Sequence, residues 1–163
     1  MSLFTADEYL EDLFSFDAEE YRRRGFSVIL LDIDNTLSPH YAQRPDERVK
    51  GFLWKLSNAG FRVILLSNNT KERVATYAKN LPVEYWYFSL KPIGLSYEYL
   101  IRKKHLKKEE ILCIGDQMLT DVLGGNLRGL HTICVKPLED KDNLPGTISR
   151  ALERVIRHVG KKM

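Results

Sequence analysis

Short apolar runs alternate with segments of helical period from Phe26 onward, and this alternation constrains the fold more than any other feature of the chain. The runs are continuously apolar, which is typical of strands that helices cover on both faces. We expect strands at 26–32, 61–67, 85–88, 111–115 and 132–135. Helices are expected at 46–58, 70–80, 94–105, 119–128 and 147–159. The pattern predicts a three-layer α/β sandwich around a five-stranded, mainly parallel sheet.

The first 24 residues differ from the rest of the chain. Positions 1–20 hold seven of the 22 acidic residues and none of the 25 Lys and Arg residues. Apolar residues at 4, 10, 13, 14 and 21 fit one helical face, so we expect a helical extension over 1–24 and a domain over 25–163. The residues after position 20 keep 25 bases against 15 acids, a balance that suits a phosphate-bearing ligand.

Length and composition exclude several classes of protein. The 163 residues suffice for one ordinary domain, and apolar runs such as 28–31 are far shorter than the ~20 residues of a membrane-spanning helix. No basic and then apolar signal segment opens the chain, so we expect a cytoplasmic protein. Cys113 and Cys134 lie inside apolar runs, which predicts buried, reduced thiols.

Polar side chains follow four of the predicted strands, where the carboxyl ends of parallel strands form one edge. They are Asp32 and Asp34, Ser67 with Asn68 and Asn69, Lys91, and Asp116 with Asp121. Neighbouring carboxylates repel unless a cation lies between them, and oxygen donors without His or Cys favour Mg²⁺. The cation and Lys91 could hold a phosphoryl group while one aspartate attacks phosphorus. A second aspartate would serve the leaving oxygen and the hydrolytic water as general acid and base.

The run Asp32-Ile33-Asp34-Asn35-Thr36-Leu37 resembles the first motif of the haloacid dehalogenase (HAD) superfamily in its phosphatase form. Ser67, Lys91 and residues 115–121 match its other three motifs in order. The resemblance implies a Rossmann-like HAD fold with Asp32 as nucleophile and Asp34 as general acid/base. It also implies Mg²⁺ on Asp32, Asp116 and the Asp34 carbonyl, with Asp121 in support. The substrate phosphate would meet Asn35, Thr36, Ser67, Asn68 and Lys91.

The spacing of these motifs leaves no room for an inserted cap domain, after the first motif or between the second and third. A capless core with this first motif resembles subfamily IIIA and its YqeG-like bacterial proteins. These proteins are similar to the mitochondrial phosphatidylglycerophosphate phosphatase. The resemblance therefore implies an open site for a phosphorylated small molecule or a lipid head group, and no specific nucleic acid.

Other interpretations stay open at this point. The same chemistry fits a soluble phosphate ester or nucleotide, and a phospho-accepting receiver domain shares the sheet, aspartate, hydroxyl and lysine. Receivers lack a second aspartate two positions on, so Asp34 is the discriminating residue.

Two further segments have alternative interpretations. The basic run 102–108 is a solvated helix end or a peripheral contact with an anionic membrane face. His40, in the loop after the first motif, could reach the substrate. The aromatic run 85–88 is expected to be a buried strand and not a lipid-facing belt.

Overall fold

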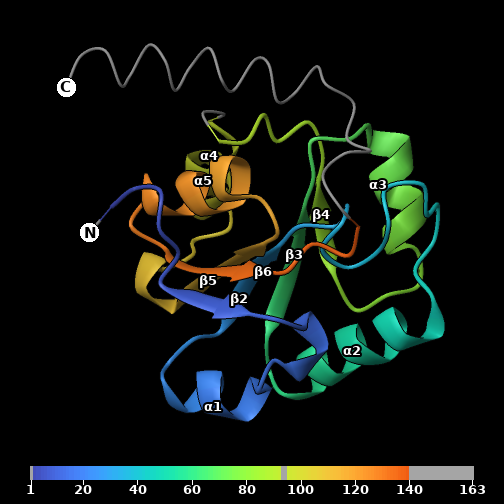
Figure 1. Ribbon diagram of the computed structural model, residues 1–163, viewed down its shortest axis with the longest axis horizontal. Helices are drawn as coiled ribbons and strands as arrows, with labels where there is room; N and C mark the ends of the chain where they lie inside the picture. The colour runs from blue at the N-terminus through green and yellow to red at the C-terminus, as the bar shows by residue number, and fades with distance from the viewer. Residues whose placement is uncertain (1, 93–94, 140–163) are drawn as a thin grey trace.

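The computed structural model describes residues 2–92 and 95–139. Its centre is a six-stranded sheet in the order β1-β6-β5-β2-β3-β4, with every neighbouring pair parallel (Figure 1). The strands are β1 (Glu8–Leu10), β2 (Val28–Leu31), β3 (Arg62–Leu66), β4 (Glu84–Trp86), β5 (Ile111–Gly115) and β6 (His131–Val135). The α/β sandwich with a parallel sheet is thus confirmed.

Helices cover both faces of this sheet. They are α1 (Ala18–Arg23), α2 (Glu47–Asn58), α3 (Lys71–Ala78), α4 (Ser96–Lys103) and α5 (Leu123–Asn126). Successive residues of β2 point to opposite layers, as the pleat of a strand requires. Ile29 and Leu31 pack in the core with α1, α2 and α3, whereas Val28 and Leu30 pack with α4. Figure 1 shows α4 and α5 on one side of the sheet and α1 and α2 on the other.

The expectation of five strands is wrong, because the N-terminal segment adds a sixth. β1 pairs in parallel with β6, from Glu8 opposite Ile133 to Leu10 opposite Val135. It covers what would otherwise be an exposed sheet edge. The segment expected to be a helical extension over 1–24 is therefore not all helical: over its described residues, 2–24, a 3₁₀ turn (Leu13–Ser15) and α1 are the helical parts. Leu13 and Tyr21 are buried in the same core as α2 and α3.

Capping residues in the sequence predicted where the helices α2 and α3 begin. The side chains of Asp46 and Thr70 cap α2 and α3 by accepting hydrogen bonds from the amides three residues on. The expected helix 119–128 is instead a π-helix (Met118–Val122) that continues into α5. The expected helix 147–159 lies outside the described residues.

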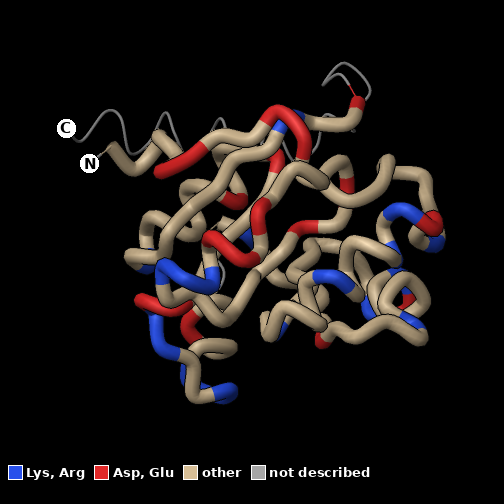
Figure 2. The backbone as a smooth tube through the Cα atoms, turned by 90° about the horizontal axis from the view of Figure 1, so that it is seen from below, with Lys and Arg blue, Asp and Glu red and all other residues tan. Residues whose placement is uncertain are grey.

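The distribution of polar and apolar groups agrees with the layered fold. Cys113 and Cys134 are buried thiols that form no disulfide with each other, as predicted. Figure 2 shows acidic positions next to the N-terminus and several more through the middle of the molecule. Over residues 2–92 and 95–139, no helix has the length and apolar character needed to cross a membrane.

Candidate active site

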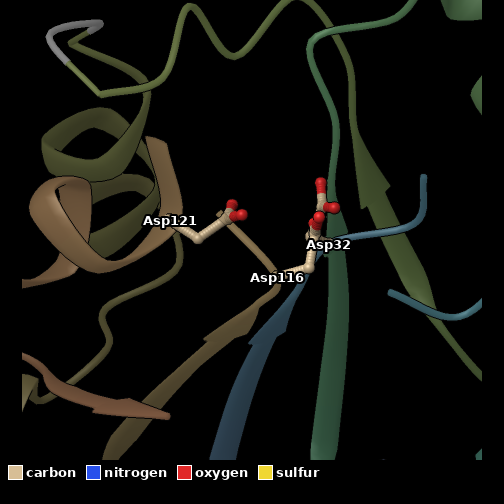
Figure 3. A group of neighbouring side chains, drawn as sticks. All are labelled: Asp32, Asp116 and Asp121. Carbon is tan, nitrogen blue, oxygen red and sulfur yellow. The ribbon is translucent and has the colours of Figure 1, made fainter. Parts of the chain in front are cut away.

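Three buried carboxylates converge at the carboxyl edge of the sheet. Asp32 follows β2, Asp116 follows β5, and Asp121 lies on the π-helix; Figure 3 shows their side chains pointing toward one another. One oxygen of each lies within 4.8 Å of the others. The structure thus brings together aspartates that lie up to 89 positions apart in the chain.

Lys91 is the cation that contacts this group among the described residues. Its Nζ donates to Asp32 Oδ1 at 2.7 Å and to Asp121 Oδ1 at 2.5 Å, and its side chain is buried. Burial alone lowers the pKa of Lys91, but the charges of Asp121 and Asp32 outweigh it and raise the pKa above its ordinary value. Lys91 is therefore an ammonium group.

One ammonium does not neutralise three carboxylates. Burial raises the pKa of Asp32 well above its ordinary value, and the charges of Asp121 and Asp116 add to this while Lys91 opposes it. Burial and the Asp121 charge raise the pKa of Asp116 to about 7. Because all the donor atoms are oxygens and one more cation would relieve the repulsion, the cluster fits a hard divalent ion such as Mg²⁺.

Asp121 reaches the cluster because of Gly115. A Cβ atom at Gly115 would lie 2.2 Å from Asp121 Cγ, so any larger residue would occupy the space of that carboxylate. The π-helix begins just after Gln117, whose amide donates to Asp121 Oδ2 at 3.3 Å. A widened turn of this kind is frequent at functional sites.

The Asp34 carboxylate is held apart from the three-aspartate group. Asn69 Nδ2 donates to its Oδ2 at 2.7 Å, and Arg73 Nη2 donates to its Oδ1 at 2.8 Å. Arg73 also donates to the carbonyl oxygens of Ala42 and His40. His40 Nδ1 lies 3.9 Å from Asp34 Oδ1, so the structure places this histidine beside the predicted acid/base.

The sequence analysis placed Asn69 at this strand end without a role in the site, and it missed Arg73. Their positions in the chain were the available signal. Asn69 lies just before the helix that follows the second motif and Arg73 lies in its first turn, at the same edge of the sheet as Asp34. The helix prediction for 70–80 could have placed Arg73 in the first turn and facing the loop after β2.

The four other predicted phosphate-binding side chains make hydrogen bonds within the protein. Thr36 Oγ1 accepts from the Asp116 amide and lies 3.1 Å from oxygens of Asp32 and Asp116. Asn68 Oδ1 accepts from the Ser89 hydroxyl and the Lys91 amide, so it positions the loop that carries Lys91. The remaining pairs are Asn35 with both backbone groups of Glu139 and Ser67 Oγ with the Asn69 amide. Their phosphate contacts stay predictions.

The raised pKa of Asp116 predicts a pH-dependent stability of the metal-free protein. Asp116 has a pKa of about 7 in the folded state against 3.8 ordinarily, so folding favours its protonated form. The stability it contributes is therefore complete below about pH 4 and is lost as the pH rises to about 7, by at most roughly 4 kcal/mol. In EDTA, Asp116→Asn is expected to flatten the fall in unfolding free energy between pH 5 and pH 8, measured by urea denaturation. An unchanged fall would contradict this, and exposed Asp12→Asn is the control.

Comparisons with known proteins agree with this fold. A HAD-hydrolase-like family profile matches residues 90–143, which include Lys91, Asp116 and Asp121. A protein of Bacillus subtilis (strain 168) named "Probable phosphatase YqeG" is 35% identical over 153 residues, covering 94% of this chain and 89% of that protein. The fold and the site thus define a HAD-like hydrolase.

The chain belongs to the family of YqeG within the HAD-like hydrolases, and it is a phosphatase. The phosphatidylglycerophosphate phosphatase 1, chloroplastic/mitochondrial, of Arabidopsis thaliana is 29% identical over 147 residues. That match covers 79% of this chain and 40% of the plant protein. An uncharacterized protein from Listeria monocytogenes serotype 4b shares the fold, with a TM-score of 0.59 at 17% identity over 85% of this chain and 100% of that one.

Proposed function

We propose that this protein is a Mg²⁺-dependent phosphomonoester hydrolase that works through an aspartyl-phosphate on Asp32. The observation that carries the proposal is the buried group of Asp32, Asp116 and Asp121 around Lys91 at the carboxyl edge of the sheet. Repelling carboxylates are costly to bury, so their convergence supports a site kept for catalysis.

Asp32 is the proposed nucleophile. One of its oxygens would form a bond to phosphorus as the bond from phosphorus to the ester oxygen breaks, and Asp34 would give its proton to that leaving oxygen. Water would then attack the phosphorus of the aspartyl-phosphate and pass a proton to Asp34, releasing inorganic phosphate and restoring the Asp32 carboxylate. Asn69 and Arg73 hold the two Asp34 oxygens in place for both steps.

Lys91 and the metal ion would reduce the charge repulsion of the reaction. The Lys91 ammonium, already 2.7 Å from Asp32, can bind the oxygens of a phosphoryl group that approaches this carboxylate. Asp32 and Asp116, with Asp121 in support and the Asp34 carbonyl in addition, would hold the ion. When bound, Mg²⁺ supplies positive charge against the oxygens of the phosphoryl group.

Phosphatidylglycerophosphate is the substrate that we propose. Similarity to the plant enzyme named for that lipid supports it, although this chain spans 40% of that protein. The connections also support it: one helix separates β3 from β4, and the segment from β2 to α2 spans 32–46 without an inserted domain. A site without a cap is open to a phosphate displayed on a surface.

Two arms of one assay test this function. We expect phosphate release in Mg²⁺ to be lost in EDTA and restored by added Mg²⁺, because the carboxylates would repel an incoming phosphate without the ion. Activity that persists in EDTA would refute metal dependence. In the second arm, detergent-dispersed phosphatidylglycerophosphate is compared with glycerol 3-phosphate and a nucleoside monophosphate. The lipid is expected to have the highest kcat/KM, and turnover of the soluble esters alone would overturn the lipid assignment.

A further inference from the structure

The loop between β4 and α4 exposes large apolar side chains on both sides of Lys91. Phe88, Leu90 and Leu95 are 53%, 70% and 81% exposed. Ser89 and Lys91, which alternate with the first two, are buried. The backbone arrangement that turns Lys91 into the site therefore turns Phe88 and Leu90 out to the surface beside it.

Exposed apolar side chains are unexpected at these two positions. Phe88 and Leu90 have φ angles of +45° and +51°, in the left-handed region that bulky residues rarely adopt. Asn tolerates that region and would be solvated at the surface. The chain thus accepts backbone strain and exposed apolar area together, which indicates that the side chains serve an interaction.

The surroundings of this loop indicate the kind of partner. Residues 85–97 contain one charged residue, Lys91, and it is buried. At the sides, Lys71 Nζ lies 5.9 Å from the ring centre of Tyr87, and Lys103 Nζ lies 5.7 Å from that of Trp86. A loop whose exposed side chains are apolar, flanked by lysines beside aromatic rings, is typical of segments that bind the surface of an anionic bilayer.

Two other loops at the same edge of the sheet also expose apolar side chains. Tyr41, in the loop after β2, is 74% exposed, and Leu138, after β6, is 47% exposed. The Leu138 amide donates to the Asn35 carbonyl at 3.1 Å, so it lies close to the loop of the nucleophile. A flat surface in contact with these three loops would lie over the active site.

We propose that the loop 86–92, with Leu95, docks on an anionic lipid bilayer and brings the active site against the membrane. The idea that the membrane supplies the substrate rests on the proposed function, whereas the docking of the loop does not depend on it. Phe88 and Leu90 enter the boundary between head groups and acyl chains, while Lys71 and Lys103 contact anionic head groups.

Apart from Lys103, whose Nζ lies 5.7 Å from the centre of the Trp86 ring, the basic run 102–108 does not provide this surface. α4 leads away from the carboxyl edge, and the run ends just before β5, where the Glu110 carbonyl accepts from the Ser27 amide ahead of β2. Lys104 and the rest of the run after it lie at the amino edge of the sheet, where Arg62 at the start of β3 donates to the Lys104 carbonyl, so a membrane bound there would face away from the site. Lys104 and Lys108 also pair with Glu84 and Glu98.

Vesicle flotation of the full chain tests the docking. Wild type is expected to float with vesicles of phosphatidylcholine and phosphatidylglycerol, and Phe88→Asn/Leu90→Asn is expected to bind at least about tenfold more weakly, since two inserted side chains are lost. Because Asn suits a positive φ, the same variant is expected to melt at an equal or higher temperature, which separates lost binding from unfolding. Trp54→Gln, at an exposed apolar position on α2, is the matched control and should bind like wild type.

Three outcomes would overturn the docking. They are a wild type that stays unbound, a double variant that binds like wild type, and loss of binding in Arg102→Gln/Lys107→Gln while the double variant still binds.

The vesicles carry no phosphomonoester lipid, and Asp32→Asn should float like wild type, so the result is independent of catalysis. Hydrolysis of soluble esters without vesicle binding would remove the docking and leave the proposed chemistry. Binding without hydrolysis of phosphatidylglycerophosphate would leave the docking and remove the substrate.

Discussion

Asp32→Asn is expected to lower kcat for phosphomonoesters at least about 10³-fold, the largest effect we predict. The amide has nearly the shape of the carboxylate, so the side chain can stay between Lys91 and Thr36, but it is not a nucleophile toward phosphorus. Loss of a residue that forms a covalent intermediate typically removes most of the acceleration.

Two measurements check this prediction. Steady-state phosphate release gives kcat, and acid quenching of wild type with labelled substrate should trap an acyl phosphate that Asp32→Asn does not form. Asp12→Asn, at an exposed aspartate paired with Arg48, is the control and should keep full activity. If Asp32→Asn retained a tenth of the wild-type rate, Asp32 could not be the nucleophile.

Gly115→Ala is expected to reduce activity at least about 100-fold although residue 115 carries no functional group. The added methyl would lie 2.2 Å from Asp121 Cγ and 2.3 Å from its Oδ2, so the carboxylate must leave its position. Lys91 would then lose one of its two carboxylate partners, and the metal would lose a supporting residue. Removal of one such electrostatic contribution commonly costs ~10²–10³ in rate.

The cost in stability separates this steric effect from a general loss of folding. We expect Gly115→Ala to lower the free energy of unfolding by about 1–3 kcal/mol, as overpacking commonly does. Gly51→Ala is the matched control, because a Cβ atom there meets nothing within 4 Å. Gly51 lies inside α2, so its replacement should raise stability slightly and leave activity unchanged. Full activity in Gly115→Ala would show that the Asp121 position is dispensable.

Prediction from sequence succeeded where a pattern was local and long. The buried strand expected at 85–88 is instead β4, a half-buried strand at the edge of the sheet, and Phe88 lies beyond it and is exposed. The other four predicted strands have at least four consecutive buried residues and were predicted near their observed positions, because such apolar runs are unusual outside strands covered on both faces. β1 was missed for the opposite reason. It has three residues, is partly exposed, and forms a strand because the edge of β6 is available for pairing. Its apolar residues also fit a helical face, so the sequence pattern was ambiguous.

By itself, the sequence determined the class of fold and the chemical groups at the site. Parallel strands place their carboxyl ends at one edge, so Asp32, Lys91 and Asp116 could be expected to meet there. Only the tertiary structure decided which of the charged side chains contact one another. Whether Asp121 joins the cluster depends on the space left by Gly115, and whether Asp34 pairs with Arg73 depends on how α3 packs against the loop after β2. Such distances between distant parts of the chain follow from packing, which no local sequence pattern encodes.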